Sequence, residues 1–286
     1  MVDRIALFID QAVSLQENPR KAAQLCKAEI RALYADYTDA TVHYWLTKYR
    51  NAIRAAKLDT PYLALMREPV RKVQATRKRF QSDLYKRQAH QHPIYDADAI
   101  VEQAVALLDK ESYAAVSIGI ALLTGRRIYE VCVTGSFTIV RGQAHQVRFS
   151  GQAKTRDVKK ANKPYLIPVL IGPKQIVNAV AYLRSLRDFT DYLPTNDADV
   201  SPRSRAFQDR TGKTLREMCT KQFDRLVPDC TPHDLRKIYA VIAYDWFAPV
   251  DMSVGRYVSE ILGHSENDLG TVQSYQDFYL ATHTSV

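Results

Sequence analysis

Residues 122–131 read LLTGRRIYEV, and they close the most apolar stretch of the chain. Ser112 can cap a helix, and the residues after it are almost all apolar, which predicts a helix buried on every side. Gly125 would stop that helix, because glycine readily adopts the left-handed conformation found at helix ends. The chain then re-enters a short helix, so Arg127 is expected at a helix junction, emerging from a core. The alternative is a surface arginine that pairs with Glu130 three residues later, and this stretch alone does not separate the two.

A second stretch, FSGQAKTR over residues 149–156, is predicted as a strand that ends in a turn. It belongs to a group of three β-like runs, namely Thr138–Val140, His145–Ser150 and Tyr165–Leu170. The turn would project Lys154. A lysine on a turn is usually just solvated, so this stretch by itself predicts no function.

A third stretch, TPHDLRK over residues 231–237, predicts the start of a helix. Thr231 is a typical N-cap, and Pro232 is a typical first helical residue. His233 and Arg236 would then be neighbours on the first turn, where the helix dipole and the free N–H groups favour a phosphate. The alternative is a capping histidine beside a surface arginine, but the shared direction of the two side chains favours anion binding.

Two shorter pieces follow, ILGH over residues 261–264 and TVQSYQ over residues 271–276. The first predicts a helix that stops directly before His264. The second contains Tyr275, one of 17 tyrosines in the chain. An isolated tyrosine nearly always serves packing, so only the position of Tyr275 downstream of His264 distinguishes it.

Together these stretches supply what the transfer of a DNA phosphodiester to a protein side chain requires without a metal ion. The reaction needs a nucleophile, a proton donor for the leaving oxygen, and cations around a doubly charged transition state. Arginine suits the non-bridging oxygens because its planar fork donates two parallel hydrogen bonds and stays charged. A covalent phosphotyrosine keeps the bond energy, so neither ATP nor any other cofactor is expected.

The order of these residues resembles the catalytic set of the tyrosine recombinases. The set consists of Arg127, Lys154, His233, Arg236, His264 and Tyr275. Within that superfamily the chain most resembles the telomere resolvases, or protelomerases, of phages and of bacteria with linear replicons. The finer resemblance rests on FSGQAKTRD, YLIPVL, RKIYAVIAYDWFAP, ILGHSENDLGTVQSYQDFYL and, near the N-terminus, YWLTKYRNAIRAA.

Two details bear on the choice between a resolvase and an integrase. The segment SENDLGTVQS between His264 and Tyr275 makes an interval slightly longer than the usual one in integrases, which favours a resolvase. His233 is the ordinary residue of recombinases, whereas some resolvases carry other residues there, and this favours an integrase.

The resemblance implies a role for each member of the set. The two arginines and His264 would bind the non-bridging oxygens, and His233 would assist them or handle the proton of the nucleophile. Lys154 would protonate the leaving 5′ oxygen, and Tyr275 would form a 3′-phosphotyrosyl bond. In a telomere resolvase each freed 5′ hydroxyl then attacks across the duplex, which gives two covalently closed hairpin ends.

The distribution of residue types along the sequence predicts two domains. Residues 1–92 are expected to be a helical DNA-binding domain, with helices that begin near residue 5, at Pro19 and after Thr38. Residues 93–286 are expected to be the catalytic domain, and the polar segment 88–93 is the expected linker. Further helices are expected at about residues 96–108, 174–186, 214–226, 232–247 and 254–262. The predicted fold is therefore mainly α-helical with a small antiparallel sheet, that is, a tyrosine-recombinase-like catalytic domain preceded by a helical domain.

Residues 67–87 form a strongly basic run that only Glu68 and Asp83 oppose. A solvated helix face is the usual meaning of such a run, but the scarcity of acids favours contact with DNA phosphates. The candidate phosphate contacts in this run and in the preceding helix are Lys48, Arg50, Arg54, Arg71, Lys72, Arg77, Lys78 and Arg79.

The composition excludes several classes of protein. The 286 residues carry a formal net charge of +9, which suits a polyanionic partner. The four cysteines form no CxxC pair, so we expect reduced thiols and no zinc site. We find no secretory signal and no apolar stretch long enough to span a bilayer. The expected location is the cytoplasm of a bacterial or phage-infected cell, in association with the nucleoid and not with a membrane.

Three functions remain open at this point. The first is a telomere resolvase that acts as a homodimer on an inverted-repeat site in double-stranded DNA. The second is a site-specific tyrosine recombinase or integrase, which exchanges strands between two duplexes by the same chemistry. The third is a basic helical DNA-binding protein without enzymatic activity, which leaves the ordered set of residues unexplained.

Overall fold

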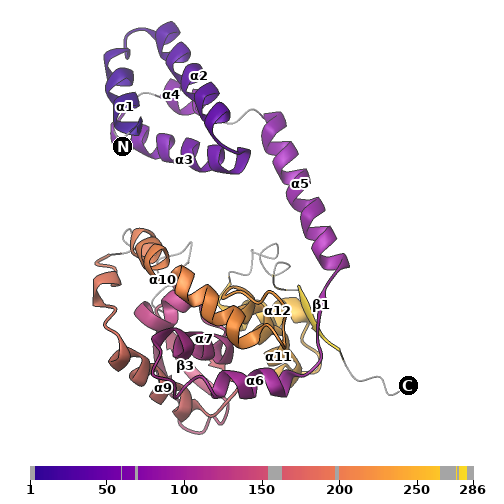
Figure 1. Ribbon diagram of the computed structural model, residues 1–286. Helices are drawn as coiled ribbons and strands as arrows, with labels where there is room; N and C mark the ends of the chain where they lie inside the picture. Colours follow the sequence, from indigo (N-terminus) through magenta and orange to yellow (C-terminus); the bar gives the residue numbers. More distant parts are fainter. Residues whose placement is uncertain are drawn as a thin grey trace. The chain divides into compact units, whose positions relative to one another are not determined.

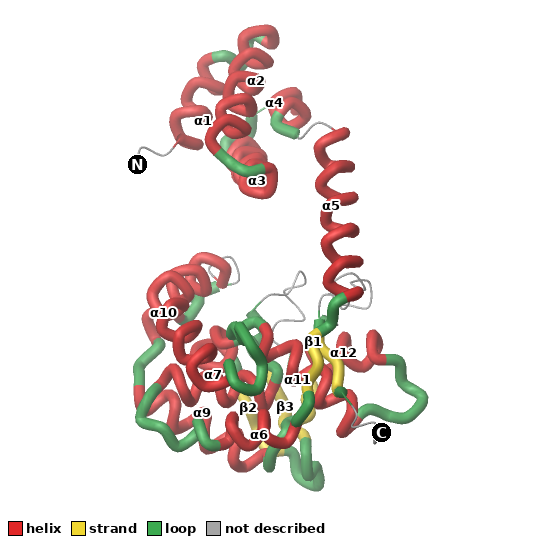
Figure 2. Tube along the Cα trace, turned by 45° about the vertical axis from the view of Figure 1, so that its right-hand side comes forward, coloured by secondary structure: helices red, strands yellow, loops and turns green. Residues whose placement is uncertain are grey.

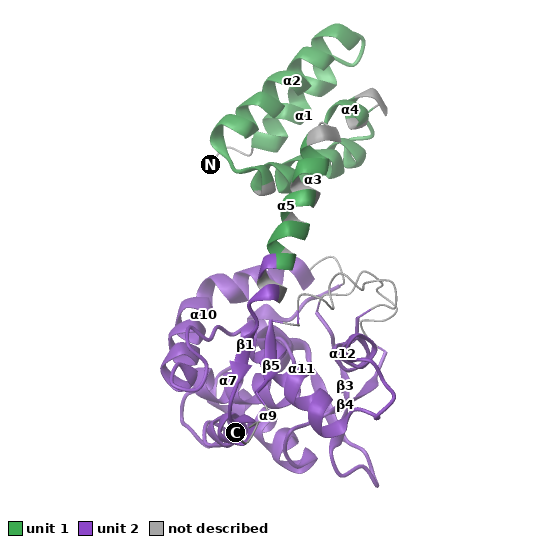
Figure 3. Cartoon of the chain, turned by 90° about the vertical axis from the view of Figure 1, so that its right-hand side faces the viewer, with its two compact units in different colours: residues 1–85 green, residues 86–286 purple. Residues whose placement is uncertain are grey.

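The computed structural model describes residues 4–58, 60–67, 70–153, 163–196, 200–264, 275 and 277–281. The chain forms two compact units, residues 1–85 and residues 86–286, each with a hydrophobic core of its own (Figure 3). The division between them falls within a single long helix.

The described part of the first unit is helical. Its elements are α1 (Arg4–Ser14), α2 (Pro19–Asp36), α3 (Asp39–Ala55), α4 (Thr60–Leu65) and the first part of α5 (Val70–Ala89) (Figure 1). The start of α2 follows from the sequence, because Asn18 accepts a hydrogen bond from the backbone N–H of Lys21 and Pro19 needs no such partner. The apolar stripes of these helices meet in a core that includes Leu33, Leu46 and Ile53.

The second unit has more elements and a larger core. They are β1 (His92–Ile94), α6 (Ala97–Val105), α7 (Tyr113–Thr124), the π-helix η1 (Glu130–Thr134), β2 (Ser136–Ile139), β3 (Gln146–Ser150), β4 (Tyr165–Pro168), α9 (Pro173–Leu186), the 3-10 helix η2 (Thr190–Tyr192), α10 (Val200–Phe223), α11 (Asp234–Phe247), α12 (Val254–Leu262) and β5 (Phe278–Leu280). Among the described residues, no helix combines the length and the apolar character needed to cross a membrane.

Helix α7 is the centre of the second unit, and α6, α9, α10 and α11 pack around it. Nearly every one of its side chains is buried, as its apolar sequence predicts. It begins after Ser112, whose hydroxyl accepts a hydrogen bond from the N–H of Ala115, and it ends at Gly125 with a left-handed backbone. A side chain at position 125 would overlap the ring of Tyr239, so glycine is required there both for its backbone and for its size.

The predicted antiparallel sheet is confirmed, with the strand order β2–β3–β4. Figure 2 labels β2 and β3 among its yellow strands. A second, parallel pair of strands, β1 and β5, was not predicted. Residues 88–93, expected as a linker, comprise the end of α5, two residues outside any helix or strand, and the start of β1. The pair joins the first segment of the second unit to a segment near the C-terminus, since the N–H of His92 donates to the carbonyl of Asp277.

Two helix boundaries differ from the sequence prediction. Helix α10 begins at Val200 and not near residue 214, because Pro202 lies in its first turn, where a missing N–H costs nothing, and Gly212 is tolerated in its interior. Helix α11 begins at Asp234 and not at Pro232, because Thr231 bonds to the Asp234 carboxylate through its N–H and its hydroxyl and so closes a turn ahead of the helix.

Candidate active site

Two adjacent arginines follow the end of α7, and their environments are opposite. Arg126 is buried, and its guanidinium donates hydrogen bonds to the Tyr165 hydroxyl and to two backbone carbonyls, one of them in α12. Arg127 borders a cavity, and its Nη1 lies 2.7 Å from Oε1 of Glu130. Arg127 thus makes the i,i+3 ion pair and also faces the site, so each of the two sequence interpretations describes part of its role.

Glu130 is a buried acid among the basic residues of the site. It opens the π-helix η1, and its carboxylate accepts hydrogen bonds from the backbone N–H and the guanidinium of Arg127 and, at 3.1 Å, from the N–H of Ala153. Burial would raise the pKa of this carboxyl, but Arg127, Arg236 and Arg126 outweigh it and hold the pKa at about 2. Glu130 is therefore charged at neutral pH and fixes two segments of the site to each other.

Arg236, in the first turn of α11, joins three parts of the site. Its Nη1 donates to the carbonyl of Gly125 at the end of α7, and its Nη2 donates to the carbonyl of Leu262 at the end of α12. Its Nε lies 3.2 Å from the hydroxyl oxygen of Tyr275. Burial and the neighbouring arginines lower the pKa of Arg236 to about 10, which still leaves it charged at neutral pH. A guanidinium has five N–H donors, and these contacts use three of them and fix the position of the group.

Two histidine rings lie beside Tyr275. The ring of His264 is perpendicular to the ring of Tyr275, with centroids 5.1 Å apart, and the ring of His233 lies 6.2 Å away. His264 follows the left-handed Gly263 that ends α12, as the sequence predicts. Burial lowers the pKa of His233, and the Lys237 ammonium adds to this effect, so the neutral imidazole is favoured at pH 7.

Lys154, the predicted proton donor, lies outside the described residues. The residues directly before it are described, and they are anchored on both sides of the site. Gln152 donates from its side chain to the carbonyl of Gly263 at 2.9 Å, and Ala153 donates from its backbone to Glu130. Gly151 has a φ of 89°, and its carbonyl accepts the hydroxyl of Thr134.

A cavity of about 590 Å³ opens onto this cluster. One wall carries Arg127, His233 and Arg236, and the other is the face of α10 that carries Ser204, Gln208 and Arg216. Cations on one side and neutral or basic polar groups on the other suit a phosphodiester backbone. In the described part of the chain, no cluster of histidine, cysteine, aspartate or glutamate has the arrangement to hold a metal ion.

Of the six residues predicted from the sequence, the structure brings five together and describes nothing of the sixth, Lys154. Sequence reasoning missed four further members of the cluster, which are Arg126, Gln152, Tyr165 and Lys237, and gave Glu130 only a surface pairing. Arg126 and Arg127 are adjacent residues of the same type, so only their distance from the helix end at Gly125 decides which of them is buried. The π-helix that carries Glu130 has no sequence signature that we recognise, although π-turns are frequent at functional sites.

The candidate phosphate contacts of the first unit fall into two groups. Arg50 donates to the carbonyl of Met66 and to the Thr47 hydroxyl, and Lys72 lies 3.1 Å from the Asp39 carboxylate. The second group is exposed and consists of Lys48, Arg54, Lys78 and Arg79. The side chains of Arg71 and Arg77 lie outside the described residues.

Residues 92–278 match the family model described as the telomere resolvase ResT/TelK catalytic domain. The chain belongs to this family. The match runs from the start of β1 to the first residue of β5, and so it includes every residue of the cluster described above. The resemblance to telomere resolvases predicted from the sequence is thereby confirmed.

Curated relatives agree with this assignment. Telomere resolvase ResT of Borreliella burgdorferi is 26% identical over 162 residues, which is 57% of this chain and 33% of that protein. Protelomerase of Escherichia phage N15 is 30% identical over 199 residues, which is 66% of this chain and 30% of that protein. The chain thus spans about a third of the length of these relatives.

Solved structures match over nearly the whole chain. A point variant of protelomerase TelA, covalently complexed with substrate DNA, has a TM-score of 0.80 and 25% identity, over 98% of this chain and 90% of that one. Protelomerase TelK, complexed with substrate DNA, has a TM-score of 0.64 and 19% identity, over 99% of this chain and 60% of that one, and supports the fold alone. The predicted tyrosine-recombinase-like fold is confirmed by these matches.

Proposed function

We propose that this chain is a telomere resolvase, which cleaves an inverted-repeat site in duplex DNA through a 3′-phosphotyrosyl intermediate and rejoins each strand as a closed hairpin. The observation that carries the proposal is the placement of Tyr275, whose hydroxyl oxygen lies 3.2 Å from Nε of a buried arginine and whose ring centroid lies 5.1 Å and 6.2 Å from those of two histidines. A tyrosine held only for packing needs neither the arginine nor the histidines.

The cluster supports a specific division of labour in the cleavage step. The Tyr275 oxygen attacks the phosphorus and loses its proton, and the bond from phosphorus to the 5′ oxygen breaks. Arg236 donates to the attacking oxygen and has two further N–H groups for a non-bridging oxygen, and Arg127 approaches the same phosphate from the cavity wall. Neutral His233 is suited to accept the tyrosine proton, and Lys154 returns a proton to the departing 5′ oxygen.

Rejoining is the reverse step with a different hydroxyl. The freed 5′ hydroxyl of the opposite strand attacks the phosphotyrosine, and Tyr275 leaves and regains its proton. No bond energy is lost, so ATP is not consumed. Two strands must be cut, so two active sites and hence a homodimer on the DNA are required. The exposed basic side chains of the first unit bind phosphates of the same DNA, and the protein acts on the nucleoid of a bacterial or phage-infected cell.

The decisive experiment uses a single palindromic duplex from the genome that encodes the chain. We expect two products that re-form a duplex rapidly after denaturation and resist exonuclease at the new ends. Joined products from two differently labelled duplexes, without any snap-back species, would establish the integrase alternative, which the ordinary recombinase residue His233 favours.

The same reaction run in EDTA tests the nature of the chemistry. We expect unchanged rates, because the cluster places arginine and histidine where a metal ion would otherwise bind the phosphate oxygens. Loss of activity in EDTA, with recovery on addition of magnesium, would contradict the assignment of Tyr275 and its basic neighbours.

A further inference from the structure

The segment that carries Tyr275 is bound to the rest of the second unit two residues later, at Asp277. Oδ2 of Asp277 lies 2.8 Å from Nζ of Lys237, and the same ammonium lies 2.8 Å from Oδ1 of Asp234. All three side chains are largely buried, with 11% exposure for Lys237 and Asp277 and 19% for Asp234. Lys237 follows Arg236 directly in α11, so adjacent residues of one helix contact Tyr275 and Asp277.

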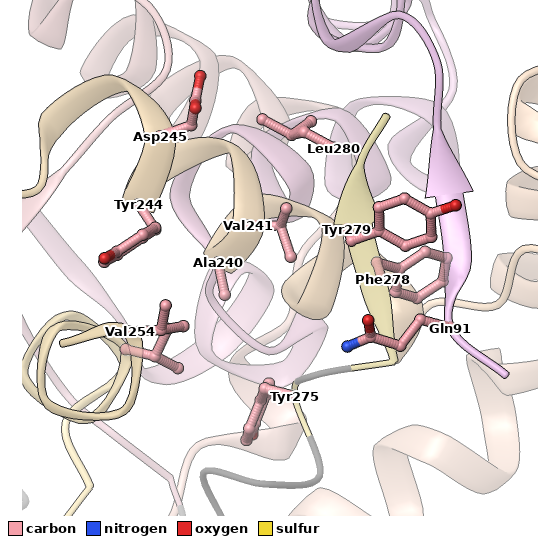
Figure 4. Close-up of a pocket in the computed structure, with 11 residues that line it drawn as sticks. Gln91, Ala240, Val241, Tyr244, Asp245, Val254, Tyr275, Phe278, Tyr279 and Leu280 are labelled. Carbon is pink, nitrogen blue, oxygen red and sulfur yellow. The ribbon is translucent and has the colours of Figure 1, made fainter. Parts of the chain in front are cut away.

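The backbone of Asp277 is held from the opposite direction. Its carbonyl accepts the N–H of His92, the first residue of β1, and the parallel register of β1 with β5 begins at the next residue. Figure 4 shows β1 and β5 side by side, with Tyr275 ahead of β5 and the residues of α11 on the other side. Asp277 is therefore fixed through its backbone by β1 and through its side chain by α11.

The packing around the Tyr275 ring explains why such a tether is needed. A cavity of about 270 Å³ lies along the ring, lined by apolar side chains that include Ala240, Val241 and Phe278 (Figure 4). A ring that borders a cavity lacks van der Waals partners on that side, so packing alone defines its position poorly. The contact from Arg236 fixes the hydroxyl end, and a second anchor is required for the backbone.

We propose that Lys237 is a positioning residue for Tyr275: by bridging Asp234 and Asp277 it holds the backbone that carries the nucleophile against α11. The bridge also links the start of α11, where His233 and Arg236 lie, to the tyrosine segment, so the groups that act on one phosphate move as a unit. Of the two carboxylates in the bridge, Asp234 belongs to α11 and Asp277 to the segment that carries Tyr275. The activity arm of the test below rests on the proposed function, whereas the spectroscopic arm does not.

The test removes Lys237 and Asp277 together, so that neither of these two charges is left buried without the other. In Lys237→Met/Asp277→Leu both charges are lost together, and Asp234 keeps its two hydrogen bonds to Thr231. The control, Arg256→Gln/Glu260→Gln, removes an exposed i,i+4 ion pair of the same net charge from α12. A second control, Leu183→Ala, lowers stability from a buried position in α9 and shows how far stability alone affects each measurement.

The first measurement uses the free protein, with 3-fluorotyrosine placed at position 275 and observed by fluorine NMR. We expect one narrow signal in the parent and in both controls, and a broadened or multiple signal in the double variant. A double-variant signal that superimposes on the parent signal would overturn the proposal, whatever the protein does to DNA.

The second measurement is the single-turnover rate of covalent complex formation at saturating protein on a palindromic duplex. We expect a loss of about tenfold or more in the double variant, with DNA affinity changed by no more than about twofold, because small displacements of a nucleophile are costly. A rate within about twofold of the parent would overturn the proposal. If the parent itself forms no covalent complex, the proposed function fails, and the fluorine spectra still decide about Lys237.

A further variant keeps the proposal testable if the double variant does not fold. Asp277→Asn preserves the shape of the side chain and leaves Lys237 paired with Asp234. The same two measurements apply to it, with the same expected direction. Parent-like spectra together with a parent-like rate in Asp277→Asn would overturn the proposal.

Discussion

Arg236 of the second unit and Lys78 and Arg79 of α5 are all cations that we assign to DNA, but the protein holds them in different ways. Arg236 is 2% exposed and donates to two backbone carbonyls and to Tyr275. Lys78 and Arg79 are exposed on the helix surface. A buried, hydrogen-bonded cation has a fixed position and little contact with salt ions, whereas an exposed one adapts to a phosphate and is screened.

This difference indicates that the fixed position of the buried cations serves the chemical step, whereas the charge of the exposed cations serves DNA binding. The buried cluster is suited to stabilise one transition state, because its donors need no reorganisation when the reaction occurs. The exposed set is suited to hold a long polyanion, because releasing counterions from DNA requires charge and not a fixed geometry. Changes in the first group should therefore alter the rate or the fold, and changes in the second should alter affinity and its dependence on salt.

The largest effect is expected from Tyr275→Phe. The phenylalanine ring keeps the contacts with His264, so DNA affinity should be retained, but no oxygen remains to attack the phosphate. Covalent protein–DNA complexes on a denaturing gel should fall to background. A covalent complex at the parent level would show that another residue is the nucleophile and that the cluster around Arg236 serves only binding.

The next effect concerns Lys154, for which the family resemblance implies a role as proton donor and not as a binding residue. Lys154→Ala should slow cleavage of an ordinary phosphodiester by roughly 10²–10⁴-fold, the usual contribution of a general acid. A substrate with a 5′-bridging sulfur should escape most of that loss, because the sulfur leaves without protonation. Equal impairment on both substrates would make Lys154 a phosphate-binding cation like the two arginines.

A third effect tests whether the buried cluster depends on the charge of Glu130. Glu130→Gln should lower the free energy of unfolding at pH 7 by roughly 3 kcal/mol, because it removes the charge that three arginines surround. The folded-state pKa of Glu130, about 2, lies below the ordinary value of 4.5, so its contribution is complete above pH 4.5 and is lost as the pH falls toward 2.

The check is denaturant unfolding of the parent and the variant between pH 7 and pH 2. The difference in unfolding free energy between them should shrink as the pH falls through that window. A difference that is independent of pH would show that Glu130 stabilises the fold by shape and not by charge.

The sequence predicted most of the fold because its signals were local. The cap at Ser112, the helix start at Pro19 and the glycines at helix ends are decided by neighbouring residues, and local hydrogen bonds to Ser112 and to Asn18, the residue before Pro19, are found there. The pairing of β1 with β5 was missed because it joins residues far apart in the chain, and strands this short carry little pattern. The π-helix was missed for a related reason, since its extra residue is stabilised by tertiary contacts.

The candidate site was predicted in the residues that belong to short motifs and missed in those that only hold other parts of the protein in place. Arg127, His233 and Tyr275 belong to recognisable short motifs. Arg126, Lys237 and Asp277 bind other parts of the protein, and no motif specifies a contact across the fold such as that between Arg126 and Ile261 in α12. A single sequence indicates which residues meet the substrate more readily than which residues hold them in place.

The smallest effect per residue is expected from the exposed cations of α5, and it concerns DNA affinity. Replacing Arg77, Lys78 and Arg79 together by glutamine should weaken binding to any duplex, whatever its sequence, because phosphates carry no sequence information. Each phosphate contact that is lost should reduce the slope of log affinity against log salt by about 0.9. The cleavage rate at saturating protein should not change, since the buried cluster remains intact. Lys174→Gln, which removes an exposed charge from α9, is the control for net charge alone. Affinity and salt slope equal to those of the parent would show that α5 presents a solvated face. A reduced rate at saturating protein would show that α5 also acts on the chemical step. That result would remove the distinction between the two groups of cations.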